Sequence, residues 1–239
     1  MNTSQIPSAY NLQSSEMQAG IQRGFLVRVY AWMTLGLVIT TVSAFFTLAI
    51  PGVIETIFSN TFIFIGLLVA ELALVIILSA AINRFPPAVA GLLFTGYAVL
   101  NGVTLSLIFL EYTSSTIAVT FGVTACTFGV MTLFGFTTHR DLTKLGSLLI
   151  MALIGMVLAS VVNLFFNNDV VYWITTYVGV LIFVGLVAYD TQKLKRMSLT
   201  VGGNGELAQR ASILGALALY LDFINLFLLL LRILGRRRR

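Results

Sequence analysis

Seven apolar stretches of membrane-spanning length, separated by short polar connections, dominate this sequence. They cover approximately residues 27–49, 61–82, 88–110, 116–136, 145–166, 170–189 and 211–234. An α-helix needs about 20 mostly apolar residues to cross a bilayer, and it satisfies its backbone hydrogen bonds internally. The pattern therefore predicts an all-α integral membrane protein with one seven-helix membrane domain over residues 23–235. A polar tail at 1–22 and a basic tail at 236–239 flank this domain.

The composition argues against enzymatic chemistry. The chain is 58% hydrophobic and only 10% charged. With one cysteine, Cys126, and one histidine, His139, it lacks the residues for a Cys/His metal centre. The sequence contains neither a nucleophile paired with a base nor a phosphate-binding loop. We therefore expect neither catalysis nor a cofactor, and the oligomeric state is left open.

Positive charge alternates between successive connections, which predicts the orientation in the membrane. Basic residues gather before the first predicted span and after the second, fourth and sixth: Arg23, Arg28, Arg84, Arg140, Lys144, Lys193, Lys195, Arg196 and Arg210. Such clusters face the cytoplasm, so we expect a cytoplasmic N-terminus and no nucleic-acid partner for the net charge of +5. Seven crossings would leave the C-terminus outside, whereas the block 236–239 favours the inside. The side of this basic tail is left open.

Four polar residues inside or beside the predicted spans are candidates for function. A carboxylate at membrane depth costs at least about 2.5 kcal/mol and usually faces a bundle interior or a water-filled path. Asp222 lies about halfway along the last span, and Asn225 follows it on the same helical face. Asp190 lies near the end of the sixth span. Glu71 in the second span is either a hydrogen-bonded structural acid or part of an ion pathway.

If Asp190 and Asp222 meet, their chemistry is constrained. Two like charges in a low-dielectric site cannot both ionise cheaply, so the pair tends to share a proton. When both are ionised, the pair gains most from a divalent cation, and carboxylate oxygens suit Ca²⁺. Protons and calcium would then compete for the same site. The spacing of the two residues does not show that their helices are neighbours.

The segments around these aspartates resemble a known family. GLVAYDTQKLKR and SILGALALYLDFINLFLLLLRILG are similar to the C-terminal signature of the transmembrane Bax inhibitor motif family. The likeness extends to TTHRDLTKLGSLLIMALIGMVLASVVN and to most of residues 23–235, and it is closest for the bacterial inner-membrane members.

The resemblance implies a fold in which six spans surround a central seventh, and a pH-sensitive calcium leak in at least some members. The aspartate pair of the family matches Asp190 and Asp222, and its acidic residue in the second span corresponds to Glu71. An arginine that bonds to one aspartate in the closed state has its nearest candidate in Arg84. Bacterial relatives are also linked to a membrane-bound protease, which implies a partner-binding role.

These observations predict a bacterial inner-membrane protein that passes Ca²⁺ passively under pH control. Asp190 and Asp222 would form the pH sensor and cation site, and Arg84, Glu71 and Asn225 would form a latch or pathway. Two alternatives remain open: a regulator that binds a membrane-protein partner such as a membrane-bound protease, and a proton-coupled transporter. Calcium flux into or out of liposomes separates the three.

Overall fold

The computed structural model describes residues 6–202 and 205–235, and the side chains from residue 16 onwards. In these ranges there is no β-strand, and the helices in chain order are α1 (Ile6–Ala49), α2 (Val53–Ser59), α3 (Thr61–Ala81), the 3₁₀ turn η1 (Ile82–Arg84), α4 (Pro87–Leu105), α5 (Ile108–Glu111), α6 (Ser114–Thr137), α7 (Thr143–Phe166), α8 (Asp169–Val201) and α9 (Glu206–Leu234). Seven helical segments in the described residues are long and apolar enough to cross a membrane, which confirms the predicted fold class.

Polar residues in the short connections cap the N-termini of spanning helices. The Asn60 side chain accepts hydrogen bonds from the first free N–H groups of α3, and Asn168 does the same for α8. These caps replace intrahelical partners that the first turn of a helix lacks. Pro87 occupies the first turn of α4, where its missing N–H costs nothing. A short connection that contains Pro86 joins η1, at the end of α3, to α4.

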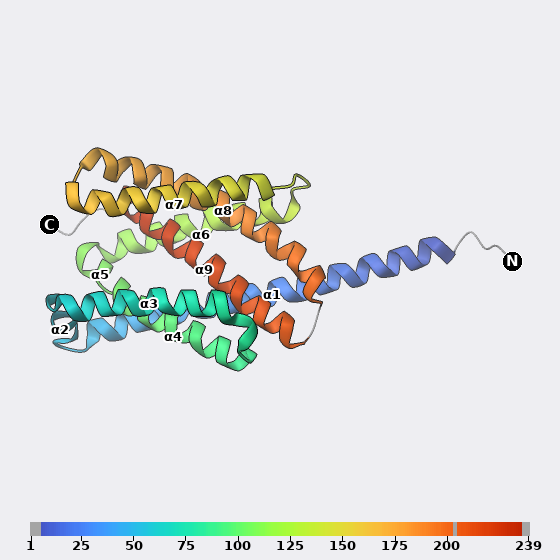
Figure 1. Ribbon diagram of the computed structural model, residues 1–239, viewed down its shortest axis with the longest axis horizontal. Helices are drawn as coiled ribbons and strands as arrows, with labels where there is room; N and C mark the ends of the chain where they lie inside the picture. The colour runs from blue at the N-terminus through green and yellow to red at the C-terminus, as the bar shows by residue number, and fades with distance from the viewer. Residues whose placement is uncertain (1–5, 203–204, 236–239) are drawn as a thin grey trace.

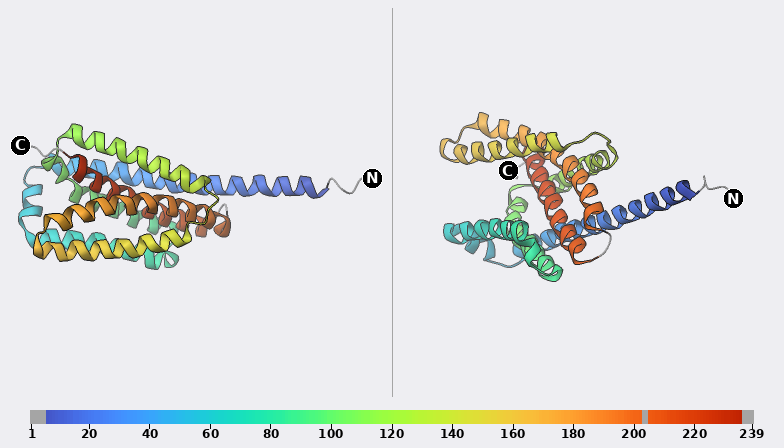
Figure 2. Two further views of the ribbon diagram at one scale, coloured as in Figure 1. Left: turned by 90° about the horizontal axis from the view of Figure 1, so that it is seen from above. Right: turned by 45° about the vertical axis from the view of Figure 1, so that its right-hand side comes forward.

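The last helix, α9, is the most buried span. In its most apolar 18-residue window 67% of the residues are buried, whereas no other span exceeds 33% and α7 has none. It packs against α8, α1, α6 and α4, and the views show it crossing between the other helices (Figure 1; Figure 2). This burial supports a central position for α9. A complete ring of six spans stays a prediction, because α7 packs mainly against α8.

Two helices extend beyond the predicted spans. α1 begins at Ile6, so the described part of the expected tail, residues 6–22, continues the first span as a helix that projects from the bundle (Figure 1). Adding turns to an existing helix avoids the cost of nucleation, which explains why a polar segment stays helical there. α8 likewise continues past residue 189 to Val201. Asp190 therefore lies well inside a helix. Residues 1–5 and the basic tail 236–239 are outside the described residues.

Candidate functional site

The structure brings Asp190 and Asp222 together. Asp190 lies on α8 and Asp222 on α9, and these two helices pack along each other. Both side chains line the same cavity, and each carboxyl group lies within electrostatic reach of the other. Asp222 is only 6% exposed, and Asp190 is half-buried. The structure therefore places two carboxyl groups at one site between α8 and α9.

The pair faces a cavity of about 440 Å³ between α7, α8 and α9. Its lining includes four polar side chains among apolar ones: Asp190, Lys193, Asp222 and Asn225. Lys193 lies one turn after Asp190, is exposed, and attracts the Asp190 carboxylate. The Asn225 amide nitrogen donates to the Leu221 carbonyl oxygen at 2.8 Å, which leaves the amide oxygen free to accept. Asn225 therefore belongs to the site that its spacing predicted.

The buried Oδ2 atom of Asp222 lacks a partner. In the described part of the chain, no nitrogen or hydroxyl donor reaches it. Its remaining partners are the Asp190 carboxyl group, water or a cation. A buried carboxylate oxygen without a donor is costly, and a proton or a bound cation removes that cost.

The acidic ligands available to a cation at this site are few. Within residues 6–202 and 205–235 no three His, Cys, Asp or Glu side chains gather around one point. Ca²⁺ takes about six to eight oxygen ligands, so two aspartates and the Asn225 oxygen would leave the remainder to water. Such a site can hold a passing cation, whereas a tight resident-calcium site needs more carboxylates.

Arg84 and Glu71 lie apart from the aspartate pair. Arg84 is exposed at the end of η1 and does not line the cavity. The charge acting on Asp190 from a basic residue comes from Lys193 instead. The structure therefore does not bring the candidate latch to the aspartates. Glu71 lies on α3, where its carboxylate accepts a hydrogen bond from Thr104 of α4.

A second polar cluster lies between α1, α4 and α9, and the sequence analysis did not single out its members Tyr220 and Thr40. The Tyr220 hydroxyl donates to Asn101 Oδ1 at 3.0 Å and lies 2.6 Å from Thr40 Oγ1. Thr40 in turn donates to the Ala98 carbonyl oxygen at 3.0 Å. Tyr220 and Thr40 are almost completely buried. Hydrogen bonds therefore tie α9 to α1 and α4 on the side of α9 opposite to Asp222, two residues away.

The loop between α6 and α7 is fastened to α8 just beyond Asp190. The buried Gln192 side chain accepts from the Leu142 amide at 2.9 Å and donates to the Arg140 carbonyl oxygen at 2.8 Å. In the same loop Asp141 forms an exposed ion pair of 2.9 Å with Arg196. Hydrogen bonds from Thr143 and then from Arg196 lower the pKa of Asp141 to about 2. These contacts fix α8 against the membrane edge of α6 and α7.

Comparison with known proteins assigns the chain to a family. The family model described as "Inhibitor of apoptosis-promoting Bax1" matches residues 22–239. The chain is 51% identical over 222 residues to the inner membrane protein YbhL of Escherichia coli K12, covering 92% of this chain and 94% of that one. It is 42% identical over 228 residues to an uncharacterised protein of Borreliella burgdorferi, covering 95% and 98%. An uncharacterised membrane protein of Streptococcus pyogenes is 36% identical over 214 residues, covering 89% and 92%. The resemblance expected from the aspartate-containing segments is confirmed: this chain belongs to the Bax inhibitor family.

Proposed function

We propose that this protein is a pH-sensitive passive calcium leak of the bacterial inner membrane, with Asp190 and Asp222 as its proton and cation site. The observation that carries the proposal is the pair of carboxyl groups that line one cavity between the spanning helices α7, α8 and α9, with a buried Asp222 oxygen that has no donor. A buried carboxyl pair contributes little to stability that apolar residues would not supply equally well. Intramembrane carboxylates typically mark ion or proton paths. The Escherichia coli relative is an inner membrane protein, which supports the same location for this protein.

In the proposed mechanism, proton and calcium occupancy exclude each other. With one shared proton the pair carries a single negative charge and holds α8 against α9. Loss of that proton leaves two negative charges in the same cavity. Their repulsion either separates the helices or is offset by Ca²⁺, which the Asn225 oxygen and Asp222 Oδ2 can help to bind. The change in helix packing would open or close the path between the two sides of the membrane.

Lys193 is a second influence on the charge of the aspartate pair in this mechanism. Its ammonium group attracts Asp190 from the exposed rim of the cavity. A cation at that position lowers the affinity for Ca²⁺ by repulsion and favours the ionised aspartate. In this proposal Lys193 provides the positive charge beside the aspartates that the family resemblance had assigned to Arg84.

The test is calcium flux from liposomes that contain the purified full-length protein. We expect calcium to move down its gradient at a rate that depends on pH, and we expect Asp222→Asn to remove the pH dependence. Raising the calcium concentration should shift the midpoint of the pH dependence to lower pH, because the cation competes with the proton. The matched control is Asp169→Asn, which makes the same change at the exposed start of α8. This control should keep the wild-type profile.

Each alternative function predicts a different result. Absence of flux at every pH would contradict the leak and favour a partner-binding regulator. Flux of a solute only under an imposed proton gradient would identify a transporter. A leak whose pH dependence survives Asp222→Asn would remove the aspartate pair from the mechanism.

A partner-binding role is a second candidate because of α1. Its N-terminal part projects from the bundle (Figure 2), and residues 16–20 are exposed there. A projecting helix on the predicted cytoplasmic side offers a surface to another membrane protein. Cross-linking from Met17→Cys in native membranes, compared with Val157→Cys on α7, tests this role. A specific adduct that forms only from position 17 would support it.

A further inference from the structure

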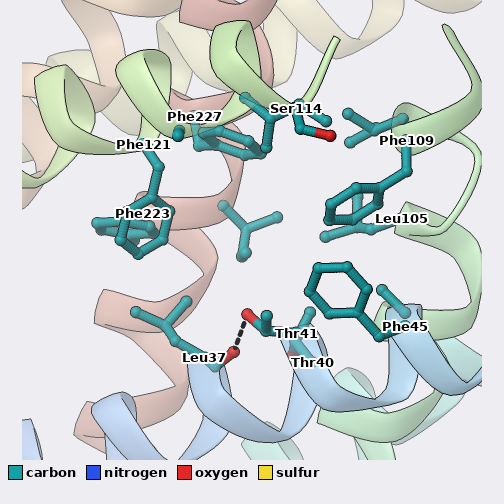
Figure 3. Close-up of a pocket in the computed structure, with 15 residues that line it drawn as sticks. Leu37, Thr40, Thr41, Phe45, Leu105, Phe109, Ser114, Phe121, Phe223 and Phe227 are labelled. Carbon is teal, nitrogen blue, oxygen red and sulfur yellow. Dashed lines mark hydrogen bonds between the residues drawn. The ribbon is translucent and has the colours of Figure 1, made fainter. Parts of the chain in front are cut away.

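An apolar cavity lies on the side of α9 away from the cavity that Asp190, Lys193 and Asp222 line. It has a volume of about 400 Å³, within the roughly 300–1,000 Å³ range of ligand pockets. Figure 3 shows its side chains arranged around an open space, with Phe121 and Phe223 on one side and Phe45 and Phe109 on the other. They come from α1, α4, α5, α6 and α9. The cavity is therefore enclosed by residues far apart in the sequence.

The cavity has a buried floor and an exposed mouth. On the floor, Ala44 is 2% exposed, Phe223 3% and Phe227 7%. At the mouth, Phe45 of α1 is 54% exposed and Phe121 of α6 is 43% exposed. Both mouth residues lie within spanning helices. The opening therefore faces the hydrocarbon interior of the bilayer.

The two helices at the mouth, α1 and α6, contact each other away from the cavity, where the Tyr30 hydroxyl lies 3.4 Å from Thr132 Oγ1. At the cavity they are separated by side chains of α9, and Phe121 packs against Phe223 with ring centroids 5.2 Å apart. The opening is thus a lateral gap between two spans with α9 at its base.

The lining suits an apolar occupant. Of its hydroxyl groups, Thr40 already bonds to the Ala98 carbonyl oxygen, and Thr41 donates to the Leu37 carbonyl oxygen at 2.8 Å (Figure 3). Ser114 lies at the first residue of α6, at the end of the span. A polar solute or hydrated ion would lose hydrogen bonds in this cavity without replacement. A hydrocarbon chain loses none and gains contact with five phenylalanine rings.

We propose that this cavity binds one acyl chain of a bilayer phospholipid, which enters between α1 and α6 and rests against α9. Ser114 at the span end would then lie near the ester and headgroup region of that lipid. The chain would contact Phe223, which directly follows Asp222 in the sequence. Lipid occupancy therefore supports α9 from the side opposite to α8. This binding site does not depend on the proposed calcium leak.

Photo-cross-linking tests the site directly. The full-length protein is reconstituted in vesicles of phosphatidylethanolamine and phosphatidylglycerol, doped with a phosphatidylglycerol that carries a diazirine in one acyl chain. Adducts on Leu158 and Phe165, which are exposed on α7, show that the probe surrounds the protein. We expect additional adducts within residues 223–227 of α9, at Phe223, Ile224 and Phe227, which are buried and line the cavity. Peptide mass spectrometry locates the adducts.

A pair of matched variants distinguishes entry into the cavity from surface labelling. Ala118→Trp places an indole at the mouth, whereas Ala70→Trp makes the same change on the exposed face of α3, away from this cavity. We expect Ala118→Trp to abolish the adducts on residues 223–227 and Ala70→Trp to leave them unchanged. If Ala118→Trp does not yield monodisperse protein, Ala118→Leu fills part of the same space.

Three results would overturn the proposal. One is wild-type protein with adducts on α7 and none on residues 223–227. Another is labelling of these residues that a folded Ala118 variant leaves unchanged. The third is labelling by a free fatty acid with the same diazirine but not by the phospholipid, which would identify a different ligand.

Discussion

The closest contact between two spans predicts a specific destabilisation. Gly135 of α6 is buried against α8, and a Cβ atom at this position would lie 2.2 Å from the Ala188 carbonyl oxygen. The obstacle is backbone and cannot rotate away, so Gly135→Ala must push the two helices apart. On the same helix, a Cβ at Gly129 would meet nothing within 4 Å. Gly129→Ala is therefore the matched control.

The magnitude follows from the difference between the two variants. Both gain the same helix propensity, up to about 1 kcal/mol relative to glycine, so this contribution cancels. Overpacking a well-filled interface costs typically about 1–3 kcal/mol, and a clash with backbone belongs at the upper end. For a chain of this size we expect Gly135→Ala to melt roughly 5 to 10 °C below Gly129→Ala.

The measurement is the temperature at which purified protein in detergent loses its monodisperse peak in size-exclusion chromatography. Gly129→Ala should match the wild type or exceed it. Equal midpoints for the two variants would show that α6 and α8 do not pack as closely as the structure has them. Such a result would also weaken the placement of Asp190, which follows Ala188 on α8 by two residues.

Three further perturbations probe the contacts around the site. Tyr220→Phe leaves the buried Asn101 Oδ1 without its donor, and the same melting assay should show a loss of about 1–3 kcal/mol; an unchanged midpoint would show that water replaces the hydroxyl. Gln192→Leu removes both hydrogen bonds to the loop between α6 and α7, so protease cleavage in that loop should become faster than in the wild type; equal cleavage rates would contradict the role of Gln192 as a fastener. The ion pair of Asp141 with Arg196 should contribute to stability above pH 4 and lose its contribution as the pH falls toward 2, because the pKa of Asp141 is about 2 in the folded protein and near 3.8 when unfolded; Asp141→Asn should remove this part of the acid dependence, and an unchanged acid profile would refute it.

The spans could be predicted from the sequence, because about 20 consecutive apolar residues have few alternatives to a transmembrane helix. The lengths of the helices outside the bilayer could not be predicted in this way. The polar segments 6–22 and 190–201 lack the apolar signal, yet they remain helical as continuations of spans. This error placed Asp190 at the end of a span, whereas the structure places it inside a long helix. Its register against Asp222 is visible only in the packed structure.

The candidate site was predictable in part. The cost of a carboxylate at membrane depth singled out Asp222, and the family resemblance supplied Asp190 as its partner. Tyr220 was not predicted, because a tyrosine in an apolar helix gives no signal until its hydroxyl is seen between Thr40 and Asn101. Arg84 was chosen as the nearest match to an arginine that the family resemblance implies, and only the fold shows it exposed and away from the cavity.

The positions of Tyr220 and Asp222 on α9 limit how the site can switch. Residues two apart on a helix point in nearly opposite directions, at about 200° around the axis. Tyr220 is bonded to α1 and α4, whereas Asp222 meets α8. A rotation of α9 that separates the carboxyl pair must also strain the bonds of the Tyr220 hydroxyl, and a rotation that frees Tyr220 must move Asp222. Because one helix carries both residues, any movement of α9 that alters the surroundings of Asp222 also alters the hydrogen bonds of Tyr220 to Thr40 and Asn101.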